Sequence, residues 1–207
     1  MANPTVEREM RRLLPAECDY LVGRLVGQEG DSQGRLVEYA EELPRALEQF
    51  GGLKLSGIAF ACTASSYLIG REREDAISAE IDIPVMWASG VIRRELTAKG
   101  VSKLAVISPY PEPIHAAGLR YWQDAGHKVV FDSRVEIGSA DTRNIYNLDG
   151  SEARPALARA RDARPDAILL SGTGMPTASL INPAGSPPIL SSNYCLAQAM
   201  ITFTGAS

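Results

Sequence analysis

Residues 57–69 read "GIAFACTASSYLI", and the rest of the chain is organised around a second copy of this stretch. A short apolar run passes through Cys62 into a turn that carries one threonine and two serines. An apolar run that ends in small hydroxyl residues is typical of a buried strand leading into a helix. The sequence therefore predicts a strand over 57–61, with Cys62 directly after its end.

The second copy is "DAILLSGTGMPTASLI", residues 166–181, in which Gly172 falls opposite Cys62. The two copies stay in step afterwards, because 83–96 ("IPVMWASGVIRREL") and 187–200 ("PPILSSNYCLAQAM") each run from a strand through serine into a helix. Such an internal repeat predicts two similar halves. Ligands of open parallel sheets bind beyond the carboxyl ends of the strands, so the turns of both halves are expected to meet at one cleft.

Short apolar runs alternate with longer amphipathic stretches along the whole chain, which is typical of strands covered on both faces by crossover helices. The predicted strands are 20–25, 57–61, 84–87, 103–107, 128–131, 167–170 and 188–190. The predicted helices are 6–13, 36–50, 76–81, 91–99, 114–125, 152–163 and 195–202. The pattern indicates an α/β fold.

We predict two pseudo-symmetric α/β lobes, each a parallel sheet flanked by helices, with the active site in the cleft between them. The first lobe is expected over 1–89 and the second over 90–192, with the last helix, 193–207, packing back on the first. The first half begins with Asn3, Pro4 and Thr5 and then a helix, without a strand that matches 103–107. Its sheet is therefore expected to have one strand fewer.

The composition excludes several classes of function. The 207 residues are 45% hydrophobic and 22% charged, with a net charge of -4, and they lack the basic excess that nucleic acids or anionic membranes attract. No apolar stretch approaches the roughly 20 residues that cross a bilayer, and the first residues do not resemble a signal peptide. We therefore expect a cytoplasmic protein with no nucleic-acid or membrane partner.

Three cysteines, Cys18, Cys62 and Cys195, are too few and too scattered for a disulfide framework or a zinc site, so each is expected to be a free thiol. Cys62 has two interpretations. It is either a small hydrophobe packed at the end of a strand, or a reactive thiol whose pKa is lowered by the N–H groups at the start of the next helix. A reactive Cys62 is expected to be alkylated well below about pH 8.5, and a packed one is not.

Five motifs stand in order along the chain: "NPTVEREMRRLLP" at 3–15, "ACTASS" at 61–66, "SPYPEP" at 108–113, "SGTGMPT" at 171–177 and "PPILSSN" at 187–193. Together they resemble the aspartate/glutamate racemase superfamily, in the branch of maleate cis-trans isomerases and arylmalonate decarboxylases. The resemblance covers nearly the whole chain. It implies two lobes with the active site between them, no metal or organic cofactor, a small dicarboxylate substrate, and cysteine chemistry at the carbon next to a carboxylate.

The chain departs from this family at one of its two cysteine positions. Racemases and isomerases of the group usually carry one cysteine in each lobe, whereas this chain has Cys62 in the first and Gly172 in the second. This departure argues against racemisation by two bases. Arylmalonate decarboxylases also use a single cysteine, but they resemble the mirror arrangement, with glycine in the first lobe and cysteine in the second.

The turns after the two repeated strands supply candidate donors for a substrate carboxylate. The candidates are Thr63, Ser65 and Ser66 in the first half, and Gly172, Thr173 and Gly174 in the second, the glycines through their N–H groups. Hydroxyl and amide donors stabilise a carboxylate as its charge spreads into an enediolate. The alternative for each serine and threonine is to cap the next helix.

Asn3 and Tyr110 lie at equivalent turns of the two halves, and they can donate two hydrogen bonds and one, respectively. The resemblance implies that both hold carboxylates of the substrate. The alternatives are an ordinary turn residue before proline for Asn3 and a lobe-interface aromatic for Tyr110. In "DTRNIYN" (141–147) the resemblance implies one more polar contact, from Thr142, with Asn144 as the next best match.

The remaining candidates are interpreted as structural. Cys18 and Cys195 are expected to pack rather than react. His115 and His127 have no acidic partner nearby in the sequence, so we expect neither a histidine-based triad nor a metal site. Residues 70–82 ("GREREDAISAEID") are charge-rich and are expected to form an exposed segment beside the cleft, with a lid as the alternative.

The leading prediction is a cofactor-independent isomerase that acts on a small dicarboxylate, similar to maleate isomerase, with Cys62 as the catalytic residue. Two alternatives stay open. One is a lyase similar to arylmalonate decarboxylase, and the other is a non-catalytic relative that binds carboxylates. The resemblance also implies a homo-oligomer.

Overall fold

Parallel strands form two separate sheets, one from each half of the chain. The computed structural model describes residues 3–28 and 30–206. The first half pairs β1 (Ile58–Phe60) with β2 (Val85–Trp87), and the second half forms a four-stranded sheet in the order β4-β3-β5-β6. The strands of that sheet are β3 (Lys103–Ser108), β4 (Lys128–Arg134), β5 (Ala167–Leu170) and β6 (Ile189–Ser191). All these pairings are parallel, which confirms the predicted α/β class.

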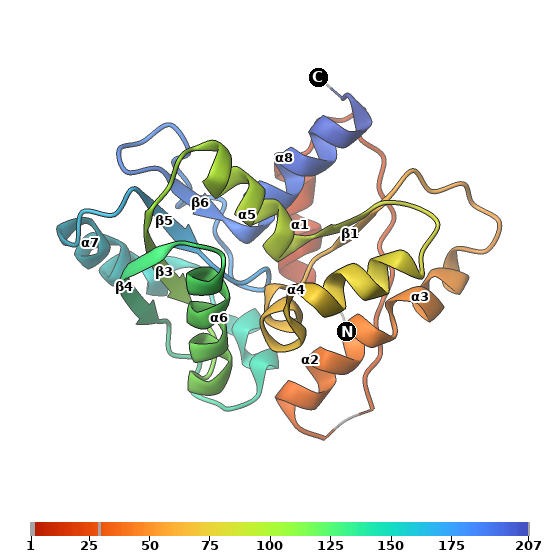
Figure 1. Cartoon of the computed structure of the whole chain (residues 1–207), viewed down its shortest axis with the longest axis horizontal. Coiled ribbons are helices and arrows are strands. Elements are labelled where there is room, and N and C mark those ends of the chain that lie inside the picture. Colours follow the sequence, from red (N-terminus) through yellow and green to blue (C-terminus); the bar gives the residue numbers. More distant parts are fainter. Residues whose placement is uncertain (1–2, 29, 207) are drawn as a thin grey trace.

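Helices connect the strands and cover the sheets. They are α1 (Pro4–Leu13), α2 (Ser32–Glu41), α3 (Leu43–Ala46), α4 (Thr63–Ala79), α5 (Ala88–Ala98), α6 (Glu112–Asp124), α7 (Arg154–Asp162) and α8 (Ser192–Thr204), with short 3-10 helices η1 (Leu47–Phe50), η2 (Thr142–Asn147) and η3 (Ser151–Ala153). Figure 1 shows α6 and α7 beside the four-stranded sheet, and α2 and α3 on the opposite side of the molecule. Helix α4 packs against both α2 and α6, and α8 packs against α1 and α5. None of the described helices has the length and apolar character that a bilayer crossing requires.

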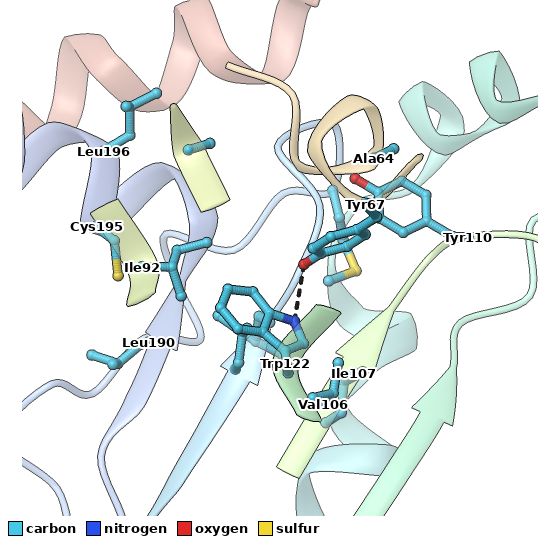
Figure 2. Close-up of a cluster of buried hydrophobic side chains, with 14 of the residues drawn as sticks. Ala64, Tyr67, Ile92, Val106, Ile107, Tyr110, Trp122, Leu190, Cys195 and Leu196 are labelled. Atoms are coloured by element: carbon cyan, nitrogen blue, oxygen red, sulfur yellow. Dashed lines mark hydrogen bonds between the residues drawn. The ribbon is translucent and has the colours of Figure 1, made fainter. Parts of the chain in front are cut away.

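The core centres on β3 and β5. All four residues of β5 are fully buried, as are Leu104 and Ile107 of β3, because helices cover both faces of a parallel sheet. Trp122 of α6 is also fully buried, and its indole N–H donates to the hydroxyl of Tyr67 on α4 at 3.1 Å (Figure 2). A buried indole N–H needs such a partner. The contact joins α4 of the first half to α6 of the second.

The strand predicted over 20–25 is wrong. These residues pair with no strand of the described chain, and Leu21 and Val22 are 60% and 45% exposed. A strand exists only through hydrogen bonds to a neighbouring strand. The described part of the first half has β1 and β2 but no counterpart of β3 or β4, so its sheet has two strands fewer than the second, where one fewer was predicted.

Two predicted helices also differ from the structure. The helix predicted over 36–50 is divided into α2, α3 and η1, because Pro44 has no N–H to donate and its ring clashes with the carbonyl of residue 40. The helix predicted over 76–81 is the end of α4, which begins at Thr63 and is interrupted at Gly70, with φ of +72°. The charge-rich stretch is therefore helical as far as Ala79. Most of its side chains are exposed, as predicted, but Glu74 is buried.

Candidate active site

Cys62 lies between the end of β1 and the first turn of α4, where it is the N-cap residue. Its side chain is buried, with 8% of its surface exposed. The hydroxyl of Ser65 donates to the sulfur at 3.2 Å, and the N–H groups of Ala64 and Ser65 also interact with it. The thiol therefore lies at the positive end of a helix, where a negative charge is stabilised.

The turn after β3 lies next to Cys62. The hydroxyls of Thr63 and Tyr110 are 2.8 Å apart, and both side chains are buried. Gly172, after β5, lies against the same turn, because a Cβ added to it would be 2.9 Å from Cδ of Pro109 and 3.4 Å from the hydroxyl of Tyr110. The turns after β1, β3 and β5 therefore meet at one place.

Asn3 and Thr173 connect the start of α1 with the residue before Cys62. Asn3 Nδ2 donates to Thr173 Oγ1 at 3.2 Å, and Thr173 Oγ1 donates to the carbonyl of Ala61 at 2.8 Å. Asn3 also caps α1, since its Oδ1 accepts from the N–H of Val6. The structure thus brings Asn3, Thr63, Ser65, Tyr110, Gly172 and Thr173 around Cys62.

Two predicted site residues donate their backbone N–H groups to serines that are not among the predicted site residues. The N–H of Gly172 donates to Ser192 Oγ at 3.0 Å. The N–H of Thr142 donates to Ser32 Oγ at 3.3 Å, and within residues 3–28 and 30–206 no hydrogen bond joins the Thr142 hydroxyl to the Cys62 region. Helix η2 approaches the site through Tyr146 instead. Its ring packs against Gly174, since a Cβ added to Gly174 would be 3.0 Å from the ring.

Three tyrosines surround Cys62, and two of them were missed in the sequence. Burial raises the pKa of Tyr39, Tyr110 and Tyr146, and a charge on Cys62 would raise the pKa of each further. Their hydroxyls therefore remain protonated and can donate hydrogen bonds. Tyr39 is in the last turn of α2, where no motif marks it. Tyr146 belongs to the stretch 141–147, in which Thr142 and Asn144 were the residues expected to contact the substrate.

Burial raises the pKa of the Cys62 thiol above its ordinary value, and the three donors around the sulfur lower it by less. The donors predicted from the sequence are present. The lowered pKa predicted with them is wrong, because the loss of hydration in this buried position outweighs the helix N-terminus. In the ligand-free protein Cys62 is a neutral thiol at pH 7.

This direction predicts the pH dependence of alkylation. The rate of Cys62 modification by iodoacetamide, measured by mass spectrometry of the Cys62 peptide, is expected to keep rising with pH beyond about pH 8.5, because only the thiolate reacts. A rate that levels off below about pH 8.5 would contradict the raised pKa. The Cys62→Ala variant is the control for labelling at other positions.

Cys18, Cys195 and His127 lie apart from these turns, whereas Nδ1 of His115 is 2.8 Å from the hydroxyl of Ser108, at the end of β3. Cys195 packs with Ile92, Leu190 and Leu196 (Figure 2), and burial raises the pKa of its thiol. His115 does have an acidic partner, contrary to the expectation, because the carboxylate of Asp132 on β4 accepts a hydrogen bond from its Nε2 at 3.0 Å. Within the described ranges no group of three or more histidine, cysteine or acidic side chains is placed to hold a metal ion.

Sequence comparison and structure comparison give different results for this chain. No known protein family matches it as a sequence, and a search of characterised proteins finds no match. Among solved structures, a mutant of the Nocardia farcinica maleate cis-trans isomerase with a covalently bound succinylcysteine intermediate matches with a TM-score of 0.85, over 98% of this chain and 89% of that one, at 20% identity. This chain has the fold of the maleate isomerases.

Further structures support the maleate isomerase fold. The maleate isomerase of Pseudomonas putida matches with a TM-score of 0.84, over 99% of this chain and 89% of that one, at 18% identity. Arylmalonate decarboxylase matches with a TM-score of 0.63, over 84% of this chain and 78% of that one, at 17% identity. The resemblance drawn from the sequence motifs is confirmed at the level of the fold.

Proposed function

We propose that this protein is a cofactor-independent enzyme that isomerises a small cis-dicarboxylate of the maleate type by addition and elimination at Cys62. One observation carries the proposal. Cys62 is a buried thiol at the N-terminus of α4, and hydroxyl and amide groups from both halves of the chain lie beside it.

The proposed reaction begins with a bond between the Cys62 sulfur and one alkene carbon. The alkene electron pair moves onto the neighbouring carboxylate as an enediolate, and the thiol proton ends on the second carbon. Rotation about the resulting single bond and loss of the same sulfur and proton give the trans product and the free thiol. A covalent succinylcysteine is the species named for the Nocardia enzyme.

Both halves of the chain contain hydrogen-bond donors for the two carboxylates of the substrate. Tyr110 and Thr63 supply hydroxyls, and Asn3 supplies an amide. The N–H groups of Thr173 and Gly174 have no acceptor within the described part of the chain. Donors that are already oriented stabilise an enediolate most where water is excluded, as it is beside a buried thiol.

Decarboxylation of an arylmalonate is the second candidate, and the single cysteine favours it. In that reaction a carbon–carbon bond breaks, carbon dioxide leaves, and the Cys62 thiol gives its proton to the enediolate carbon before solvent reprotonates the sulfur. We put this candidate second, because the fold match to arylmalonate decarboxylase gives it less support.

Turnover of two substrates tests the proposal. The protein is supplied with maleate and, separately, with phenylmalonate, and fumarate and carbon dioxide are measured. Fumarate formation without carbon dioxide release is expected. Release of carbon dioxide alone would select the decarboxylase. Turnover of neither, with Cys62 still protected from alkylation by maleate, would identify a carboxylate-binding protein without this activity.

A further inference from the structure

Glu9 of α1 is a carboxylate with no part in the chemistry above, yet it is buried, with 2% of its surface exposed. Four donors from the second half of the chain surround it. They are the N–H and hydroxyl of Thr177, the N–H of Ala178 at 2.7 Å and Nδ2 of Asn193 at 2.8 Å. A buried carboxylate with all its hydrogen bonds to neutral donors holds those donors in fixed positions.

Asn193 connects Glu9 to Thr173 by hydrogen bonds. Its Nδ2 donates both to Glu9 and to the carbonyl of Thr173, at 3.0 Å. Its Oδ1 is buried and has no hydrogen-bond partner among the described residues, so the two donated bonds set the orientation of the amide. Thr173 in turn donates to the carbonyl of Ala61, next to Cys62.

We propose that Glu9 is a positioning residue for the active site, which through Asn193 holds the turn at Thr173 against Ala61 and Cys62. Glu9 binds this loop directly at Thr177 and Ala178 and indirectly through Asn193 of α8, while Asn3, the N-cap of the same helix, binds it at Thr173. Helix α1 therefore fixes the loop after β5 at two points. The inference deepens the proposed function, because this loop carries the N–H groups of Thr173 and Gly174.

Glu9→Gln tests the proposal, since it keeps the size of the side chain but turns a donor toward the donors of the loop. It is expected to lower kcat/KM for maleate about 30-fold. The loss is expected mainly in kcat, because the N–H groups of Thr173 and Gly174 would be displaced, and these groups are proposed to stabilise the enediolate rather than the bound substrate. It is also expected to raise the rate of Cys62 alkylation about tenfold without substrate, because the bond from Thr173 to Ala61, next to Cys62, is weakened. Glu7→Gln is the matched control, because Glu7 is on the same helix but is only partly buried, in an ion pair with the exposed Arg24. Both values should stay within about twofold.

A double-mutant cycle separates positioning from a merely structural role. If Glu9 acts through Asn193, the double variant Glu9→Gln with Asn193→Ala is expected to be no worse than the poorer single variant, within about twofold. Effects that multiply would overturn the proposal, and so would a folded Glu9→Gln protein with both values unchanged. If Glu9→Gln does not fold, Asn193→Ala decides alone, and an unchanged alkylation rate would refute the proposal. If the unaltered protein converts neither substrate, the proposed function fails, but the alkylation rates still test Glu9.

Discussion

Cys62→Ala is expected to lower turnover of maleate by about 10⁴-fold or more, because the proposed bond to the substrate has no other sulfur to form it. The position opposite Cys62 is Gly172, and Cys18 and Cys195 are both buried elsewhere in the molecule. Cys62→Ser should lose nearly as much, since a serine hydroxyl ionises far less readily than a thiol. Fumarate formation at saturating maleate measures both variants.

Cys195→Ala is the matched control for this prediction. Its thiol is as buried as that of Cys62, but it packs among aliphatic side chains (Figure 2). Removing the sulfur leaves a small cavity that costs about 1 kcal/mol, which lowers Tm by about 2–4 °C in a chain of this size. Turnover should stay within about threefold. A Cys62→Ala protein that keeps more than about a tenth of the activity would refute covalent catalysis at this residue.

Gly172→Cys is expected to destroy the site rather than to supply a second catalytic sulfur. Gly172 has φ of +127°, a backbone conformation that residues with a side chain rarely adopt. A Cβ there would also lie 2.9 Å from Cδ of Pro109, in a rigid ring. The loop must shift, which breaks the bond from the Gly172 N–H to Ser192 and moves Tyr110 away from Thr63.

The expected result is a loss of about 2–4 kcal/mol in the free energy of unfolding and a loss of turnover of about 100-fold. Thermal unfolding and fumarate formation measure the two effects. Gly126→Ala is the control, because Gly126 also has a positive φ, of +92°, but nothing lies within 4 Å of the added Cβ. That variant should lose about 1 kcal/mol and no activity. A Gly172→Cys protein as stable and active as the unaltered one would contradict the crowding at this turn.

Much of this architecture could be predicted from one repeated stretch. The strands β1 and β5 and the turns that hold Cys62 and Gly172 follow from apolar runs ending in small polar residues, since burial on both faces leaves an unbroken apolar pattern. Those turns come together in the structure as the repeat predicted, with Thr63 and Tyr110 in contact. The role of these residues in a reaction stays a proposal.

Other features could not be predicted, because they depend on groups distant in the sequence. Residues 20–25 have the composition of a strand, but residues 3–28 and 30–206 offer them no neighbouring strand to bond to. His115 and Asp132 are 17 positions apart and meet only because α6 packs on β4. Glu9 contacts Thr177 across 168 positions, and nothing in the local pattern of α1 marks it.

The amino-acid order by itself determined the fold class, the internal repeat and the placing of a lone thiol at the start of a helix, because these depend on local periodicity and on the chemistry of adjacent residues. Tertiary structure alone decided whether that thiol is charged. The groups that donate hydrogen bonds to the Cys62 sulfur come from its own turn, but the desolvation that raises its pKa comes from every element packed around it. Burial is a property of the assembled molecule rather than of any segment.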